Sequence, residues 1–206
     1  MRQILLCLML GILVAGCNQD ENGCDTVWQI DRNDLSSFAR IDSSQLEMEV
    51  WNATTPNSII LTQSVLASDF ELSINLLEFE WDSVVQPQFR LEVFDNSEAV
   101  SGVAINADAF YCYVGEPQNR DMRIMHGHTG PLQISREDEM ITCSGSFGGV
   151  DLSFTDTLHS EELSVRLVLG ATNTVNGQSR VVLDDFNILG QTEMTVKPDD
   201  FSCISW

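Results

Sequence analysis

Apolar and polar residues alternate over many short stretches of the chain, and the longest of these covers residues 69–81, "DFELSINLLEFEW". Every second residue from Phe70 to Leu76 is apolar, which is the period of a strand with one face buried. Leu77 breaks this phase, and the alternation then resumes one residue out of step through Trp81. One extra residue in a long strand is typical of a β-bulge. The pattern therefore predicts a bent strand over 69–81.

Shorter stretches with the same alternation follow one another along the chain, separated by segments rich in Gly, Asn, Asp, Ser and Pro. The other predicted strands cover 46–51, 58–65, 89–94, 109–114, 121–126, 131–136, 139–147, 163–169 and 179–189. The turn-rich segments include 94–102, 115–121, 127–131, 147–151 and 173–179, and a tight turn at 136–139 joins two strands as a hairpin. No long apolar pattern of helical period occurs, so we expect an all-β sandwich or barrel.

The N-terminus has the features of an export signal. Arg2 precedes an apolar run over 4–15, which is too short for a bilayer that takes about 20 apolar residues. The run ends in "VAGC", which resembles the bacterial lipobox, where cleavage precedes an acylated cysteine. We therefore expect a signal peptide over 1–16, a lipidated Cys17, a tether over 17–24 and one domain over 25–206. The alternative is an ordinary secretory signal followed by an incidental cysteine.

The residues after Cys17 bear on location. Asn18 follows the cysteine, and in lipoproteins of the enteric type this resembles an outer-membrane address. The acidic segment that begins at Gln19 resembles the surface-export signals of some lipoproteins. The expectation is a lipid-anchored protein of the bacterial outer membrane, either periplasmic or exposed at the surface.

Composition narrows the classes of partner. The chain has 31 acidic residues against 10 Lys and Arg, and its formal net charge is −21. Such a chain repels phosphate backbones, which argues against nucleic-acid binding, and it does not favour lying on anionic lipid. The 43% of hydrophobic residues is enough for a packed core.

The six cysteines divide by their expected chemistry. Cys7 leaves with the signal and Cys17 receives lipid, so four remain in an oxidising compartment. The four are Cys24, Cys112, Cys143 and Cys203. Three connectivities are possible, and we favour the Cys112–Cys143 and Cys24–Cys203 disulfides because the first joins two predicted strands and the second ties the ends of the domain. A zinc site is the alternative, although no Cys-x-x-Cys spacing is present.

The order of the predicted pieces resembles a known fold. "SDFELSINLLEF", "QFRLEVFD", "AFYCYV", "GPLQISREDEMITCSGSFGG" and "LDDFNI" look like successive strands of the concanavalin A-like lectin/glucanase superfamily over residues 67–189. The resemblance implies an all-β, two-sheet antiparallel jelly-roll sandwich. This superfamily contains glucanases, carbohydrate-binding modules, lectins and adhesion domains, so the fold does not choose a function.

Sugar binding in such folds uses exposed aromatic rings with nearby polar groups. The segments "AFYCYV" and "GEPQNRD" offer Tyr111, Tyr113, Asn119 and Arg120 as a predicted ligand site. The two tyrosines alternate with Cys112, so they point outward if that cysteine points inward. A core role for each aromatic residue is the alternative.

Metal sites have weaker support. In related jelly rolls an Asp on the last strand helps to hold structural calcium, and the resemblance gives Asp184 and Asp185 this role. The alternative is that one of these acids is hydrogen-bonded and the other is solvated. His126 and His128 share a spacing that suits a transition metal, but no third ligand is near in sequence, so we expect turn chemistry there.

Catalytic residues are not evident. Enzymes of this fold that cleave β-glucans carry Glu-x-Asp-x-x-Glu on one strand. Glu78, Glu80 and Asp82 come nearest, but the central acid and the final spacing differ, so we expect these acids to be solvated. The leading hypothesis is a non-catalytic, lipid-anchored module that binds a glycan or a surface protein. A jelly-roll glycoside hydrolase and a structural or assembly lipoprotein are the alternatives.

Overall fold

The computed structural model of the chain describes residues 28–32, 37–42, 45–52, 58–66, 69–95, 98–115, 119–160, 163–171, 176–190 and 204–205. The predicted signal peptide, the lipid site Cys17 and the tether lie outside these residues, as do Cys24 and Cys203. No helix able to cross a membrane occurs in the part of the chain that the structure describes.

Most of the described residues lie in strands, and short turns join them. In chain order they are β1 (Trp28–Arg32), β2 (Phe38–Asp42), β3 (Gln45–Asn52), β4 (Ser58–Leu66), β5 (Phe70–Trp81), β6 (Pro87–Asp95), β7 (Glu98–Asn106), β8 (Ala109–Val114), β9 (Arg120–Ile124), β10 (Gly130–Glu137), β11 (Met140–Phe147), β12 (Val150–Thr157), β13 (Leu163–Ala171), β14 (Gly177–Gly190) and β15 (Ile204–Ser205).

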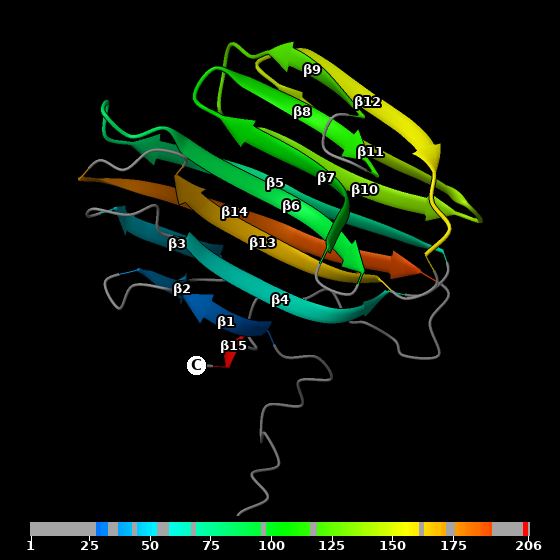
Figure 1. Cartoon of the computed structure of the whole chain (residues 1–206). Coiled ribbons are helices and arrows are strands. Elements are labelled where there is room, and N and C mark those ends of the chain that lie inside the picture. Colours follow the sequence, from blue (N-terminus) through cyan, green and yellow to red (C-terminus); the bar gives the residue numbers. More distant parts are fainter. Residues whose placement is uncertain are drawn as a thin grey trace, which may run out of the picture.

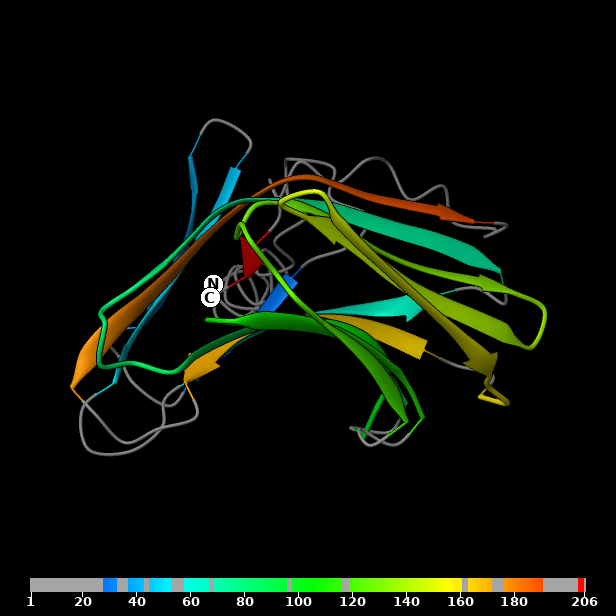
Figure 2. The same ribbon diagram turned by 90° about the horizontal axis from the view of Figure 1, so that it is seen from above.

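The strands make two sheets that pack face to face (Figure 1). The eight-stranded sheet, called sheet A, has the order β15-β1-β4-β13-β6-β7-β8-β9, and the seven-stranded sheet B has the order β12-β11-β10-β5-β14-β3-β2. Every pair is antiparallel except β1 with β15. Figure 2 shows sheet B arching over sheet A, so the outer face of sheet A lies on the hollow side of the bend. The predicted all-β jelly-roll sandwich is confirmed.

The core fills the space between the sheets, as the alternation predicts. Alternate residues of β5 from Phe70 to Leu76 are buried, and so are those of β6 and β13 that face them. The predicted bulge is also present, because β14 pairs Val182 with Glu78 and Leu183 with Leu76, leaving Leu77 out of the ladder. The bulge lets β5 keep its apolar side on the core after the break in phase.

The predicted hairpin joins β10 to β11. Glu137 pairs with Met140, so the loop is the two residues Asp138 and Glu139, and Asp138 takes a φ of 54°. Asp and Asn tolerate this left-handed conformation better than most residues, which suits such a tight turn.

One expectation about secondary structure was wrong. The segment 94–102 has turn-like composition, but residues 98–106 form β7, an inner strand of sheet A. Its small residues do not mark a turn here. Gly102 and Ala104 are fully buried on the outer face of the sheet, beneath side chains that reach across from β6 and β8. Strands β1, β2, β12 and β15 were also missing from the predicted set.

Cys112 on β8 and Cys143 on β11 face each other between the sheets. Both are buried and are free thiols in the structure, and the disulfide between them stays a prediction. Their contact is close, since a hydrogen bond with Cys143 is the main cause that raises the pKa of the Cys112 thiol, with burial second. For the second predicted pair, β1 and β15 lie side by side and bring the two ends of the domain together.

Candidate functional site

A row of polar side chains crosses the outer face of sheet A. In register from β13 to β9, Arg166 pairs with Glu92, Glu92 with Gly102, Gly102 with Tyr113, and Tyr113 with Arg120. Residues that pair in this way project from the same face of a sheet. The polar groups of four strands are thus aligned beside one glycine.

Glu92 is the centre of this row. Its side chain is fully buried although it points away from the core. One carboxylate oxygen accepts hydrogen bonds from Arg90 Nη1 at 2.8 Å and from the Tyr113 hydroxyl at 2.5 Å, and the other accepts from Arg166 Nε at 2.6 Å. A buried charge is stable only when it is paired and hydrogen-bonded in this manner. Glu92 therefore holds the surrounding side chains in fixed positions.

Small residues on β7 make this arrangement possible. A Cβ atom at Gly102 would lie 2.6 Å from the Tyr113 hydroxyl oxygen and 2.9 Å from the Leu91 carbonyl oxygen. Tyr113 consequently lies across β7, over the glycine, to reach Glu92 on the strand beyond.

Tyr111 makes a second bridge over β7. Gln88 on β6 donates a hydrogen bond of 2.5 Å to the Tyr111 hydroxyl, and this contact crosses β7 diagonally, since Tyr111 is in register with Ala104 and Gln88 with Asn106. The Arg120 guanidinium carbon is 5.1 Å from the centre of the Tyr111 ring, a cation–π arrangement. Tyr111 is half-buried and Arg120 is exposed, so both are accessible to a ligand.

The charge of this face is opposite to that of the whole chain. Among the described side chains of β6, β8, β9 and β13, it carries three arginines, Arg90, Arg120 and Arg166, against one carboxylate, Glu92. The protein as a whole has a formal charge of −21. A local surplus of two positive charges in such a chain is a specific feature of the face.

Both tyrosines remain protonated phenols. Burial is the main cause that raises the pKa of Tyr111, and it outweighs the opposing effect of Arg90 and Arg120. The pKa of Tyr113 is raised further by burial and by the neighbouring Glu92 carboxylate. These hydroxyls are hydrogen-bonding groups at neutral pH.

The four predicted ligand residues have different places. Tyr111 and Arg120 lie together, the first half-buried and the second exposed, whereas Tyr113 is buried beneath the same face. The Asn119 side-chain amide donates to the Val114 carbonyl at 2.9 Å and to Asp156 at 2.7 Å, which ties the β8–β9 connection to sheet B. This hydrogen bond is the main cause that lowers the pKa of Asp156.

Sequence reasoning missed four residues of the site, namely Gln88, Arg90, Glu92 and Arg166. The available signal was the alternation of strand 89–94, which places Arg90 and Glu92 on the face opposite the core. Their proximity to the tyrosines depends on β7 lying between β6 and β8, and β7 was not predicted.

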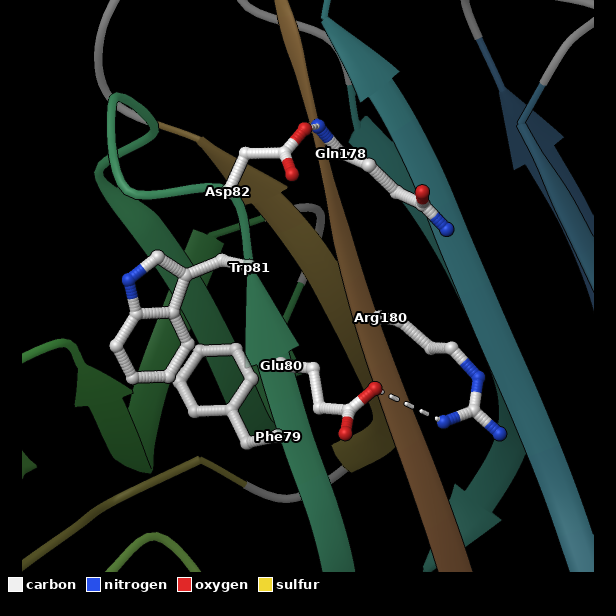
Figure 3. A pocket seen from close by; sticks show the side chains of 6 residues that line it. All are labelled: Phe79, Glu80, Trp81, Asp82, Gln178 and Arg180. Atoms are coloured by element: carbon white, nitrogen blue, oxygen red, sulfur yellow. Dashed lines mark hydrogen bonds and ion pairs between the residues drawn. The ribbon is translucent and has the colours of Figure 1, made fainter.

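A hollow of about 510 Å³ lies at the ends of β5 and β14 in sheet B, where Asp82, Gln178 and Arg180 line it (Figure 3). Its polar groups bond to one another: the backbone N–H of Gln178 donates to the Asp82 carboxylate at 2.9 Å, and Arg180 pairs with Glu80 at 3.4 Å. Figure 3 shows Glu80 and Arg180 on one side of β5, with Phe79 and Trp81 on the other.

The acidic residues that come nearest to the glucanase motif take part in these polar contacts. Glu78 and Glu80 are exposed and both pair with Arg180, which also pairs with Glu47. Burial acts to raise the pKa of Glu47, but hydrogen bonds from Arg180 and Arg40 outweigh it and lower that pKa. Glu78 and Glu80 thus have a structural explanation on the outer face of sheet B.

Asp184 and Asp185, the predicted calcium ligands, lie at a second bulge in β14. Asp185 has a φ of 53° and accepts a hydrogen bond of 2.8 Å from the Asn75 amide, while Asp184 accepts one of 3.3 Å from Gln45. The described residues contain no cluster of three or more His, Cys, Asp or Glu side chains able to hold a metal. Calcium binding by the two aspartates stays a prediction.

His126 and His128 lie in different environments. His128 packs edge-on against Trp81 at 4.8 Å between ring centres and bonds to the Ala107 carbonyl oxygen at 3.0 Å. His126 is exposed. This agrees with a local structural role for His128.

No family model and no curated protein matches the chain. Solved structures do. An alginate lyase from Corynebacterium sp. has a TM-score of 0.58 and 9% identity, covering 79% of this chain and 93% of its own. A legume lectin-like domain from Entamoeba histolytica has a TM-score of 0.55 and 10% identity, covering 81% and 91%. Lectin II from Ulex europaeus has a TM-score of 0.50 and 11% identity, covering 79% and 92%. The chain therefore has the concanavalin A-like jelly-roll fold that lectins and alginate lyases share.

Proposed function

We propose that the protein is a glycan-binding module whose site is the outer face of sheet A around Tyr111. The observation that carries the proposal is the pair of bridges over β7, which hold an accessible aromatic ring beside exposed and half-exposed arginines. Aromatic rings stack on the apolar faces of sugars, and fixed polar groups bind the hydroxyls.

Preorganisation supports binding at this face. Gln88 fixes the Tyr111 hydroxyl, and Glu92 fixes Tyr113 and two arginines. Side chains that are already held in place lose little conformational entropy when a ligand arrives. The similar structures named as lectins and alginate lyases add a precedent for sugars on this fold, at the level of the fold alone.

The chemistry of the face favours binding over cleavage. A general base for sugar chemistry should have a pKa near the working pH. Both tyrosines have raised pKa values, and Glu92 is saturated by three donors. These groups are suited to binding a sugar, and we therefore propose a non-catalytic module.

The test is a binding screen of the purified domain against neutral and acidic polysaccharides, including galactans and alginate. We expect binding that Tyr111→Ala abolishes and that Trp51→Ala preserves, since Trp51 is an exposed aromatic residue on sheet B. Absence of binding to every polysaccharide, or equal loss in both variants, contradicts the proposal.

A surface protein is the second candidate partner. Met122 and Ile124 on the edge strand β9 are 51% and 69% exposed, and Met122 pairs with Tyr111 on the same face. Apolar side chains at a free sheet edge favour protein contact. The double variant Met122→Ser with Ile124→Ser separates the two, because it should leave glycan binding unchanged and abolish capture of a protein.

The lipid anchor at Cys17 and the outer-membrane location belong to the same proposal. Their support is the "VAGC" motif, and acyl chains contribute about 0.8 kcal/mol per buried methylene to membrane binding. The anchored module would present its domain at the membrane surface.

A further inference from the structure

The charge of the sheet A face contrasts with that of the molecule, and this contrast suggests the class of ligand. The chain holds only 10 Lys and Arg residues in 206, yet three arginines lie on one face of five neighbouring strands. Glu92 neutralises one of these charges. Two positive charges therefore remain on a surface surrounded by an acidic molecule.

The most exposed arginines of this face are the two nearest Tyr111, since Arg166 is only 19% exposed. Arg90 gives Nη1 to Glu92, and its side chain is 32% exposed, although its Nε atom is buried and has no hydrogen-bond partner among the described residues. Arg120 is exposed and contacts Tyr111 through its guanidinium. No described carboxylate forms an ion pair with Arg120.

The two arginines flank the same ring. Arg90 is in register with Ala104, and Ala104 with Tyr111, so Arg90 stands two strands from the ring on the β6 side. Arg120 approaches from β9, on the other side. Strands are spaced by about 4.8 Å, which puts the backbones of β6 and β9 about 14 Å apart and gives room for one to two sugar rings.

We propose that the ligand is an anionic polysaccharide, whose sugar packs on Tyr111 while its oxyanion binds Arg120 and Arg90. This rests on the proposed glycan-binding function and adds the ligand class. Planar guanidinium groups match carboxylate and sulfate oxygens through paired hydrogen bonds. Because the rest of the surface repels polyanions, binding of one requires a local site.

The experiment compares polymers that differ in charge alone. Polygalacturonate is measured against its methyl ester, and dextran sulfate against dextran, by calorimetry at 0.15 M salt. We expect binding to at least one charged polymer and none to its neutral partner. Which charged polymer binds more tightly identifies carboxylate or sulfate as the oxyanion.

Variants test the residues. Arg120→Gln should weaken binding about tenfold or more, since it removes a charged hydrogen-bonding partner. Arg123→Gln is the matched control, because Arg123 lies on the same strand, projects from the other face and pairs with Asp121 at 2.6 Å. Arg90→Lys serves as a second variant that keeps the charge beside Glu92 and removes the planar fork.

The outcomes separate the two proposals. Equal binding of polygalacturonate and its methyl ester, lost in Tyr111→Ala, overturns the anionic ligand and keeps the glycan-binding function. Binding that Arg120→Gln and Arg123→Gln weaken equally also overturns it. Absence of binding to any polymer overturns both proposals.

Discussion

At the scale of single residues, Gly102 is the position on which the sheet A face depends most directly. Gly102→Ala would place a methyl group 2.6 Å from the Tyr113 hydroxyl oxygen and 2.9 Å from the Leu91 carbonyl. Overpacking of this kind costs about 1–3 kcal/mol, so we expect a loss of that size in the free energy of unfolding. Chemical denaturation measures it.

A double-mutant cycle with Tyr113→Ala identifies the source of that loss. If the clash with Tyr113 is responsible, the two substitutions should be non-additive by more than about 0.5 kcal/mol. Strict additivity would show that the backbone contact with Leu91 accounts for the effect.

Glu47 gives the molecule a dependence on pH. It is buried and paired with Arg40 and Arg180, and its pKa is lowered below the ordinary 4.5. A lowered native pKa stabilises the fold above the unfolded value, and this contribution is lost as the pH falls through the native pKa. We expect Glu47→Gln to cost about 1–3 kcal/mol at pH 7 and less below pH 4.5.

The measurement is the free energy of unfolding of both proteins between pH 7 and pH 3. Glu71→Gln, at an exposed acid on β5, is the control and should show no such pH dependence. A difference between wild type and Glu47→Gln that stays constant across this range would contradict the assignment.

At the scale of elements, the bulge at Leu77 absorbs a residue that the ladder does not use. Deletion of Leu77 leaves Phe79 facing the core and restores regular pairing with β14, so we expect the deletion variant to fold. Deletion of Gln133 is the control, because β10 pairs without a shift on both sides and the loss would turn Leu132 or Ile134 outward. Circular dichroism and thermal melting distinguish the two.

The contact between β8 and β11 places two cysteines where a disulfide could join the two sheets. In an oxidising compartment we expect Cys112 and Cys143 to pair, closing a loop of 31 residues and stabilising by about 3.5–4 kcal/mol in the loop-entropy model. Mass spectrometry of the unreduced exported protein should find the linked peptides. Free thiols there, with equal stability of the wild type and the Cys112→Ala, Cys143→Ala double variant, would rule this pairing out.

Elements also show what the sequence can predict. The bulge at Leu77 and the opposite directions of Tyr111 and Cys112 followed from alternation within one strand, which is a local property. The closeness of Arg90 to Tyr111 could not be predicted in this way, because it depends on the order of the strands across the sheet. The strand between them, β7, carries small residues for packing against Tyr113, and small residues also characterise turns.

At the scale of the whole molecule, the anchor is tested by the mature N-terminus. We expect mass spectrometry to find an acylated Cys17 as the first residue, and Cys17→Ala to release the protein from membranes, because a multiply acylated end supplies the membrane affinity. An unacylated Cys17 in the mature protein would refute the anchor. Cys7→Ala is the control and should leave localisation unchanged.

The side-by-side placement of β1 and β15 determines how an anchored molecule stands. Both strands form one edge of sheet A, while Tyr111 lies on β8, five strand spacings away, or about 24 Å (Figure 1). A lipid joined ahead of β1 would hold that edge toward the bilayer and leave β8 and β9 outermost, where a long polymer can approach without meeting headgroups. Immobilisation of the purified domain on a sensor through its first residues reproduces this orientation. Coupling through β9 would instead turn the proposed binding face toward the sensor and block access to it.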